Sequence, residues 1–427
     1  MRKLVLLNVF LLCILFSKCQ KFYIPYETFS AKNGLTDNYV HCIIQDHTGF
    51  IWIGGGTGLF RYDGYNFVYY KHPPGCKNCA PFNQVYSLEE DNLGLIWVLS
   101  RTGIYLFDPE TERSISAYRF GSDSISARLT SDYLDLMLDS KGNMWATNGR
   151  GLIKFSLGDS VDAKELLFSN ESVVRFRIEF IHLDQDIFSI KNITHKIYED
   201  DQGNVWVGTF DGLCLLKKGD SVFHRLDIAS ELHSGKNTYI NDILQLNEDS
   251  FYIISGKNFM MTNVKEAISK PAPEGSDIHF ECLPLPEQYI AYCLYKDRKN
   301  NVYIGTNLNV FRILRNSPQS VFSYEPLYIN PVDASDNKTY KYVHQIMEDR
   351  TGILWSANYF YGLIKYNLQP PKFKSYKKEI ETYFSNTDVN HIIIDSQGNL
   401  WIGVFGGGLY KIQNLTNQVI RYDLKIH

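Results

Sequence analysis

One short pattern, repeated along the chain, constrains the fold more than any other feature. The pattern is Asp-x-x-Gly-x-x-Trp, and all six tryptophans of the 427-residue sequence occupy its last position. Residues 297–305 and 249–252 are weaker copies, the first with Asn for Gly and Tyr for Trp, the second without either. The eight aspartates are 45 to 61 residues apart, a spacing near that of blade-forming repeats. The structural residues of the six full copies are Asp46, Gly49, Trp52, Asp91, Gly94, Trp97, Asp139, Gly142, Trp145, Asp200, Gly203, Trp206, Asp349, Gly352, Trp355, Asp395, Gly398 and Trp401.

Each repeat predicts four short strands, which in the first copy cover residues 40–45, 50–54, 59–62 and 67–70. We expect the aspartate to cap the first turn and the glycine to take a positive φ that a Cβ would resist. The tryptophan, on the second strand, is expected to lie flat where two sheets meet. Aromatic residues make up 14% of the chain, which favours strands over a helical bundle. The predicted fold class is therefore all-β, a β-propeller of four-stranded blades around a central channel.

Eight repeats allow two arrangements. In the favoured one, residues 20–378 form a seven-bladed β-propeller whose last blade takes its outer strand from residues 23–29. Residues 379–427 then form an eighth blade, the start of a truncated second propeller. The alternative is a closed eight-bladed propeller, since that blade number also occurs.

The amino terminus has the pattern of a signal peptide, predicted over residues 1–19. Arg2 and Lys3 precede an apolar stretch, residues 4–16, that is too short to span a bilayer. The predicted location is periplasmic, after export by a cleavable signal peptide, with no membrane span in this chain. In that oxidising compartment, Cys76 and Cys79 are expected to form a loop disulfide or to be two inert thiols rather than a metal or redox site.

Residues 33–40, 45–54 and 58–64 together resemble the two-component regulator propeller repeat. Residues 199–209 and 395–403 carry the same pattern. This repeat opens the periplasmic sensor region of Bacteroidetes hybrid two-component histidine kinases. The resemblance implies a ligand-sensing propeller with an oligosaccharide ligand, whose second propeller and kinase lie outside this chain. The chain itself is then expected not to be an enzyme.

Candidate ligand-binding residues lie in the loops at the end of the propeller away from the Asp-x-x-Gly turns. Aromatic rings stack on the C–H faces of sugars, and amides and carboxylates exchange hydrogen bonds with their hydroxyls. The turns between second and third strands contribute Arg101, Arg150, Phe210, Asp211, Tyr359, Phe360, Tyr361 and Phe405. The connections between blades contribute Asn38, Asn83, Asp132, Asn241, Tyr342 and Asn390.

Two other function classes stay open. A propeller enzyme of the streptogramin lyase or sialidase type would need a catalytic group that the repeat does not supply, and only His41, His195 and His344 on first strands point that way. A protein-interaction scaffold is the other class. The net charge of −4, with basic residues spread along the chain, argues against a nucleic-acid partner. We predict no cofactor and no metal, and a homodimer stays open.

Overall fold

The computed structural model describes part of the chain in detail. The described residues are 24, 26–31, 34–70, 82–117, 135–156, 177–186, 189–226, 239–264, 280–283, 285, 288–314, 323–327, 342–368, 389–405, 408–413 and 419–422. The predicted signal peptide, Cys76, Cys79 and Asp132 lie outside them. No helix within the described part is long and apolar enough to cross a bilayer.

The described strands form eight four-stranded antiparallel sheets, which confirms the all-β prediction. A single 3-10 turn, η2 Ile190–Asn192, stands among the described strands. Blades 1 to 3 contain β2 Val40–Gln45, β3 Ile51–Gly55, β4 Leu59–Tyr62, β5 Phe67–Tyr70; β6 Val85–Glu90, β7 Ile96–Ser100, β8 Gly103–Asp108, β9 Arg113–Ser116; and β10 Leu136–Leu138, β11 Met144–Asn148, β12 Gly151–Ser156, β13 Arg177–Ile181. Blades 4 and 5 contain β14 Thr194–Glu199, β15 Val205–Thr209, β16 Gly212–Leu216, β17 His224–Leu226; and β18 Ile240–Asn247, β19 Ser250–Ser255, β20 Asn258–Asn263, β21 Phe280–Leu283. Blades 6 and 7 contain β22 Ala291–Lys296, β23 Val302–Thr306, β24 Val310–Leu314, β25 Ser323–Leu327; and β26 Val343–Glu348, β27 Leu354–Asn358, β28 Gly362–Tyr366 with β1 Tyr26–Phe29.

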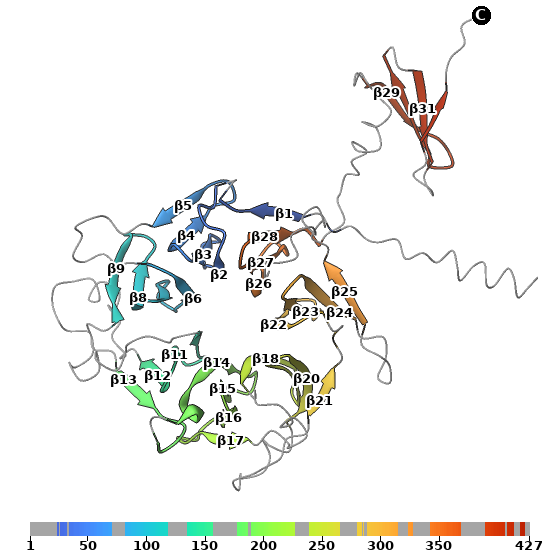
Figure 1. Ribbon diagram of the computed structural model, residues 1–427. Helices are drawn as coiled ribbons and strands as arrows, with labels where there is room; N and C mark the ends of the chain where they lie inside the picture. Colours follow the sequence, from blue (N-terminus) through green and yellow to red (C-terminus); the bar gives the residue numbers. More distant parts are fainter. Residues whose placement is uncertain are drawn as a thin grey trace, which may run out of the picture. The chain divides into compact units, whose positions relative to one another are not determined.

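Seven of the sheets close into a ring (Figure 1). The first strand of each blade lies nearest the centre, and the last strands, such as β5 and β17, lie at the rim. Strand β1 pairs with β28, so the amino-terminal strand completes the seventh blade as predicted. Because β2 contacts both β26 and β27, blade 1 packs directly on blade 7, and the closed eight-bladed alternative is wrong.

The eighth sheet belongs to a separate compact unit, Gln369–His427. It contains β29 Val389–Ile394, β30 Leu400–Val404, β31 Gly408–Ile412 and β32 Val419–Tyr422. Its first strand is exposed along its whole length, whereas the equivalent strands of the ring are largely buried. That the eighth sheet begins a second propeller stays a prediction.

The repeated aspartate and tryptophan of one blade are joined by a hydrogen bond. In blade 4, the Trp206 indole Nε1 donates to Asp200 Oδ2 at 2.8 Å, and Asp200 Oδ1 accepts the backbone N–H of Asn204 at 2.8 Å. The same indole bond measures 2.7 to 2.9 Å in each of the six full repeats. Each repeat glycine has a positive φ, for example +83° at Gly203. The carboxylate therefore holds the turn with one oxygen and positions the buried ring with the other.

In the ring, these indoles fill the seams between neighbouring blades. Trp206 packs with Leu215 of its own blade and with Ile243 and Phe251 of blade 5. Blade 6 keeps a reduced version of the arrangement, since the Tyr303 hydroxyl donates to Asp297 Oδ2 at 3.1 Å. Asn300 takes the place of the glycine there, at φ +62°. In blades 1 to 4, 6 and 7, each seam thus contains an apolar ring anchored by one polar bond.

A buried cluster of charged side chains lies at the central channel, on the consecutive blades 2 to 5. Lys196 Nζ lies 3.1 Å from Asp135 Oδ2 and 3.7 Å from Asp242 Oδ1. Burial lowers the pKa of Lys196, but the two carboxylates raise it by more, so the ammonium stays charged. Nearby Glu89 behaves in the opposite way: burial, with Asp135 adding to it, raises its pKa to about 8. The channel wall is therefore tied together by charge across three blades and contains one carboxyl group that is mostly protonated at neutral pH.

Trp206→Phe tests how much the anchored indole contributes. The smaller ring leaves a void and removes the donor to Asp200, so the free energy of unfolding should fall by about 2 to 4 kcal/mol. Tyr303→Phe, which removes only a hydroxyl bond, should cost about 1 kcal/mol. Urea unfolding followed by far-ultraviolet circular dichroism measures both. If the two variants had equal urea midpoints of unfolding, the hydrogen bond and packing of the indole would not be the main stabilising contribution of the seam.

Glu89→Gln tests the channel carboxyl. The folded protein keeps the Glu89 proton up to about pH 8, whereas the ordinary pKa is 4.5, so this group makes unfolding easier as pH rises through that window. The variant lacks this effect, so its stability relative to the natural chain should increase between about pH 5 and pH 8. Thermal unfolding across that range measures the difference. Glu248→Gln, at an exposed turn, is the matched control and should follow the natural chain at every pH.

Candidate functional site

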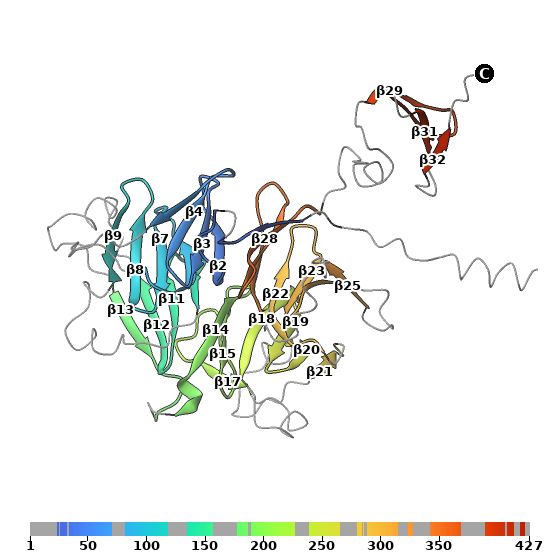
Figure 2. The ribbon, with the colours of Figure 1, turned by 45° about the horizontal axis from the view of Figure 1, so that its top comes forward.

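The turns between second and third strands and the connections between blades meet at one end of the ring. Backbone bonds join each turn to the connection entering the same blade: Phe210 N donates to Ile193 O at 2.8 Å, and Tyr359 N donates to Tyr342 O at 2.9 Å. The Asp-x-x-Gly turns lie at the other end of the same strands, which run between the two ends (Figure 2). Within the ring, the described loops predicted to bind ligand therefore share one face.

A group of aromatic and histidine side chains lies at this end, where blade 7 meets blade 1. We call it the mouth cluster. Within it, the Tyr359 ring lies 4.7 Å from Tyr39 and 4.8 Å from Phe360, measured between ring centroids. Tyr359 also lies 6.0 Å from Tyr342. The members of the mouth cluster are Tyr39, His41, Tyr342, His344, Tyr359 and Phe360.

Backbone contacts across the closing seam fix the loop that carries these rings. Phe360 N and Gly362 N both donate to Asn38 O at 3.0 Å, and Tyr39 forms an isolated bridge with Tyr359. Phe360 has φ +92°, a conformation that is costly for a bulky residue. Strain of this kind is retained where the surroundings enforce it and occurs often at ligand sites. The loop thus presents a preformed aromatic surface.

The two histidines of the mouth cluster lie at the top of the channel. Their ring centroids are 5.1 Å apart. Burial, together with the neighbouring His41, lowers the pKa of His344 to about 4, and burial also lowers the pKa of His41, so both are neutral at neutral pH. His344 Nε2 is buried and has no hydrogen-bond partner among the described residues. Since buried polar atoms are normally paired, this nitrogen is available to a ligand hydroxyl or to water.

A smaller aromatic group lies on blades 4 and 5. Phe210 stacks on Tyr239 at 6.0 Å, and His195 lies 6.2 Å from Phe210. His195 Nε2 is likewise buried without a partner among the described residues. This group repeats the chemistry of the mouth cluster, with an aromatic turn beside a channel histidine.

The remaining candidates are placed apart from one another. Arg101 and Arg150 are exposed in the turns of blades 2 and 3, and Arg101 donates to Gln84 Oε1 at 3.2 Å. Asp211 lies 3.7 Å from Arg225. Tyr361 packs against the core between blades 6 and 7. Asn83 lies in a blade connection of the ring, as predicted. Asn241 and Asn390 were also expected in connections, but each is the second residue of a strand, β18 and β29, and Asn241 Oδ1 accepts the backbone N–H of Gly256 at 3.0 Å. Phe405 and Asn390 are exposed in the separate unit.

Sequence reasoning missed Tyr39 and Tyr239. Each stands immediately before the first strand of its blade, the position that Tyr342 holds before β26. An aromatic residue recurring at this place in the repeat was the signal that would have found them. No group of three or more His, Cys, Asp or Glu side chains suited to a metal ion occurs in the described part of the chain.

Comparison with known proteins gives one family match. The family model for the two-component regulator propeller matches residues 34–57, 188–211 and 383–406. Each matched segment contains one full Asp-x-x-Gly-x-x-Trp copy. No curated protein matches the chain.

Several solved structures share the fold. The extracellular domain of the hybrid two-component system BT3049 from B. thetaiotaomicron is 19% identical with a TM-score of 0.62, and the match covers 94% of this chain and 50% of that one. The extracellular domain of the hybrid two-component system BT4673 from the same organism is 17% identical with a TM-score of 0.59. That match covers 95% of this chain and 48% of the other. Virginiamycin B lyase from Staphylococcus aureus is 12% identical with a TM-score of 0.55, over 81% of this chain and all of that one.

At these identities the likeness shows the fold, and the chain spans about half the length of the two extracellular domains. The repeat match is more specific, since it falls on the residues that build the turn and the seam. The chain therefore contains two-component regulator propeller repeats.

Proposed function

We propose that this propeller is the ligand-sensing part of a two-component sensor, located outside the cytoplasm, and that it binds an oligosaccharide at the mouth cluster. The observation that carries the proposal is the preformed aromatic loop, with Phe360 held at φ +92° beside Tyr39 and Tyr359. The matched repeat family and the shared fold with extracellular domains of two-component systems support the sensor role.

The chemistry of the mouth cluster suits a sugar. Tyr and Phe rings offer flat apolar faces for the C–H side of a pyranose, and all the tryptophans of the ring are committed to the seams. The unpaired Nε2 of His344 and the exposed amide of Asn38 are polar partners for hydroxyl groups. The arginine turns of blades 2 and 3 add positive charge that would favour a carboxylated or sulfated sugar.

The position of the cluster also suits a sensor. Tyr39 belongs to the start of the ring and Tyr359 to its end, so a ligand that contacts both adds interactions across the closing seam. Such a ligand must stabilise the closed ring by its binding free energy.

A lyase-type propeller enzyme is the second candidate. The specific observation in its favour is the pair of neutral channel histidines, His41 and His344, beside the same loop. Histidine is the commonest general acid or base, and a pKa near the working pH is what that role requires. The low pKa of His344 fits a hydrogen-bonding role better than proton transfer at neutral pH.

Phe360→Ala should weaken glycan binding. A thermal-shift screen of the chain against a glycan library should identify a ligand that raises the unfolding temperature, because it binds only the folded state. Calorimetric titration with that ligand should then show at least a tenfold loss of affinity in Phe360→Ala, since one stacking face is removed. Tyr65→Ala removes an aromatic ring that is 90% exposed in the β4–β5 turn at the opposite end, and should bind as the natural chain does.

A binding loss shared equally by both variants would contradict a site at the mouth cluster. Turnover of the bound glycan, or of a lactone panel, would favour the lyase-type candidate. A library that gives no shift while a protein partner is bound would favour the interaction scaffold.

A further inference from the structure

The repeat is weakest in blades 5 and 6, and this changes the seam between them. Blade 5 has Tyr252 at the position that the indole occupies elsewhere, and its first two strands are joined by a tight turn in place of Asp-x-x-Gly. Tyr252 packs 5.0 Å from Phe259 of its own blade, between ring centroids. This seam is therefore filled by a smaller ring than the seams that contain Trp52, Trp97, Trp145, Trp206 and Trp355.

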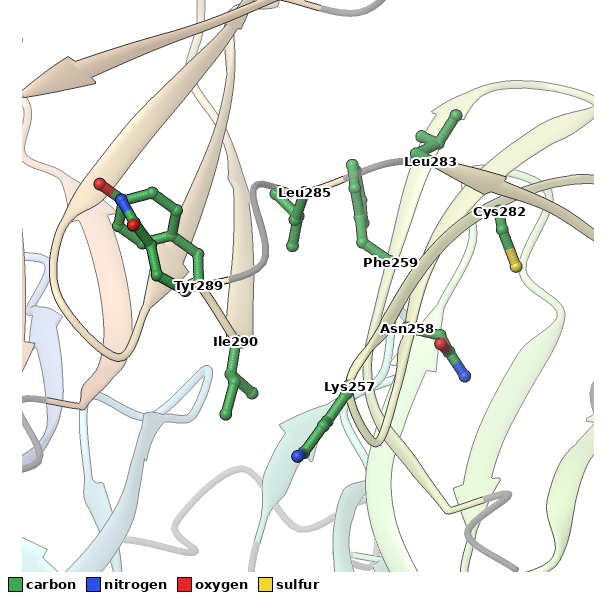
Figure 3. Close-up of a pocket in the computed structure, with 9 residues that line it drawn as sticks. Lys257, Asn258, Phe259, Cys282, Leu283, Leu285, Tyr289 and Ile290 are labelled. Atoms are coloured by element: carbon green, nitrogen blue, oxygen red, sulfur yellow. The ribbon is translucent and has the colours of Figure 1, made fainter. Parts of the chain in front are cut away.

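A cavity of about 430 Å³ opens at the same seam (Figure 3). Phe259 and Leu285 form its apolar interior, with Lys257 on the side of blade 5 and Tyr289 on the side of blade 6. It lies beside the β19–β20 turn, so it is at the ligand-facing end of the ring but on different blades from the mouth cluster. The volume falls within the range of small-molecule sites.

Comparison with the first seam shows how the rim of the cavity differs. Phe82 stands three residues before β6 and is buried between blades 1 and 2, with its ring 5.7 Å from Phe107 and 6.0 Å from Tyr105. Three positions before β22 stands the exposed Gln288, and the ring contact is made instead by Tyr289, whose centroid lies 4.7 Å from that of Phe311. The aromatic residue is therefore shifted by one position, and an amide is left at the rim.

The lining has two chemical zones. One side of the lining is formed by Phe259, Leu285 and Tyr289, and this apolar side favours an aromatic or short aliphatic body, although the lining as a whole exposes more polar than apolar surface. The rim carries the Lys257 ammonium, for which the described part of the chain provides no carboxylate partner, together with the amide of Gln288. A positive charge next to an apolar cavity favours a ligand with a carboxylate or sulfonate at one end.

We infer that the cavity between blades 5 and 6 is a second binding site, independent of the mouth cluster, for a small organic anion with an apolar body. The ligand places its apolar part against Phe259, Leu285 and Tyr289 and its anionic group next to Lys257. The site lies at the seam where Tyr252 stands in place of the indole.

The test uses 8-anilinonaphthalene-1-sulfonate, an aromatic sulfonate whose fluorescence rises in apolar surroundings. Gln288→Phe places a large ring at the rim of the cavity, so it should weaken the saturable binding of the probe at least tenfold. Gln202→Phe adds the same ring at an exposed turn of blade 4 and should leave that binding unchanged. Lys257→Gln should weaken the binding of the probe severalfold. Lys299→Gln, at an exposed turn of blade 6, is its control and should leave the binding unchanged.

Cys282 gives a second test that does not depend on the folding of a variant. Its thiol is free and exposed at the edge of the cavity. Treatment with N-ethylmaleimide should block the probe in the natural chain, because the added group enters the cavity. The same treatment of Cys282→Ser should leave the probe bound, which controls for the other cysteines.

The outcomes are distinct. Loss of the probe in Gln288→Phe, or after alkylation of Cys282, supports the site. Saturable binding that survives both changes, or no saturable binding to the natural chain, overturns it. Neither result depends on whether a glycan binds the mouth cluster.

Discussion

The hydrogen bond between the repeated aspartate and the indole six residues later is the interaction on which the ring depends. A propeller has no single core, because its apolar side chains are divided among the seams between blades. An indole placed in a seam brings a polar N–H into an apolar environment, and an unpaired N–H there would cost more than the ring gains from a better fit. In blade 4, the Asp200 carboxylate accepts the hydrogen bond of the Trp206 indole and also holds the turn. One side chain therefore couples the local fold to the packing of neighbouring sheets.

Most of the architecture follows from this repeat and was predictable from the sequence. The period gave the number of blades, the turns gave the strand limits, and the amino-terminal strand β1 was expected in the last blade and is found there. The role of the aspartate was only half predicted: the turn cap was expected, but not the bond to the indole. The spacing Asp-x-x-Gly-x-x-Trp places the two side chains on neighbouring strands, yet their bonding depends on ring orientation, which a pattern does not encode.

The candidate site was less predictable, because loops are not governed by the repeat. Tyr359 and Phe360 were selected as a dense aromatic turn, and the structure brings them together with Tyr39 and Tyr342. Arg101 and Arg150 were selected from the corresponding turns of blades 2 and 3 and do not join that group. The difference comes from the closing of the ring. Residues of blade 1 and blade 7 are far apart in the sequence and become neighbours only because blade 7 packs on blade 1. The repeat pattern predicts where each loop lies in the sequence, but it does not predict which loops contact one another in the folded ring.

The seams also explain where binding capacity can arise in such a ring. The residues of a seam that contains an anchored indole are constrained by the repeat. Departures from the repeat release this constraint, as between blades 5 and 6, where Tyr252 replaces the indole and a cavity of about 430 Å³ opens. The seam between blades 7 and 1 differs in another way. Its aromatic loop, which contains Tyr359 and Phe360, is fixed by backbone bonds to Asn38, a residue far away in the sequence. In this protein, the irregular seam and the closing seam are where side-chain chemistry departs from the repeat, and the regular seams provide the rigid frame that holds both in place.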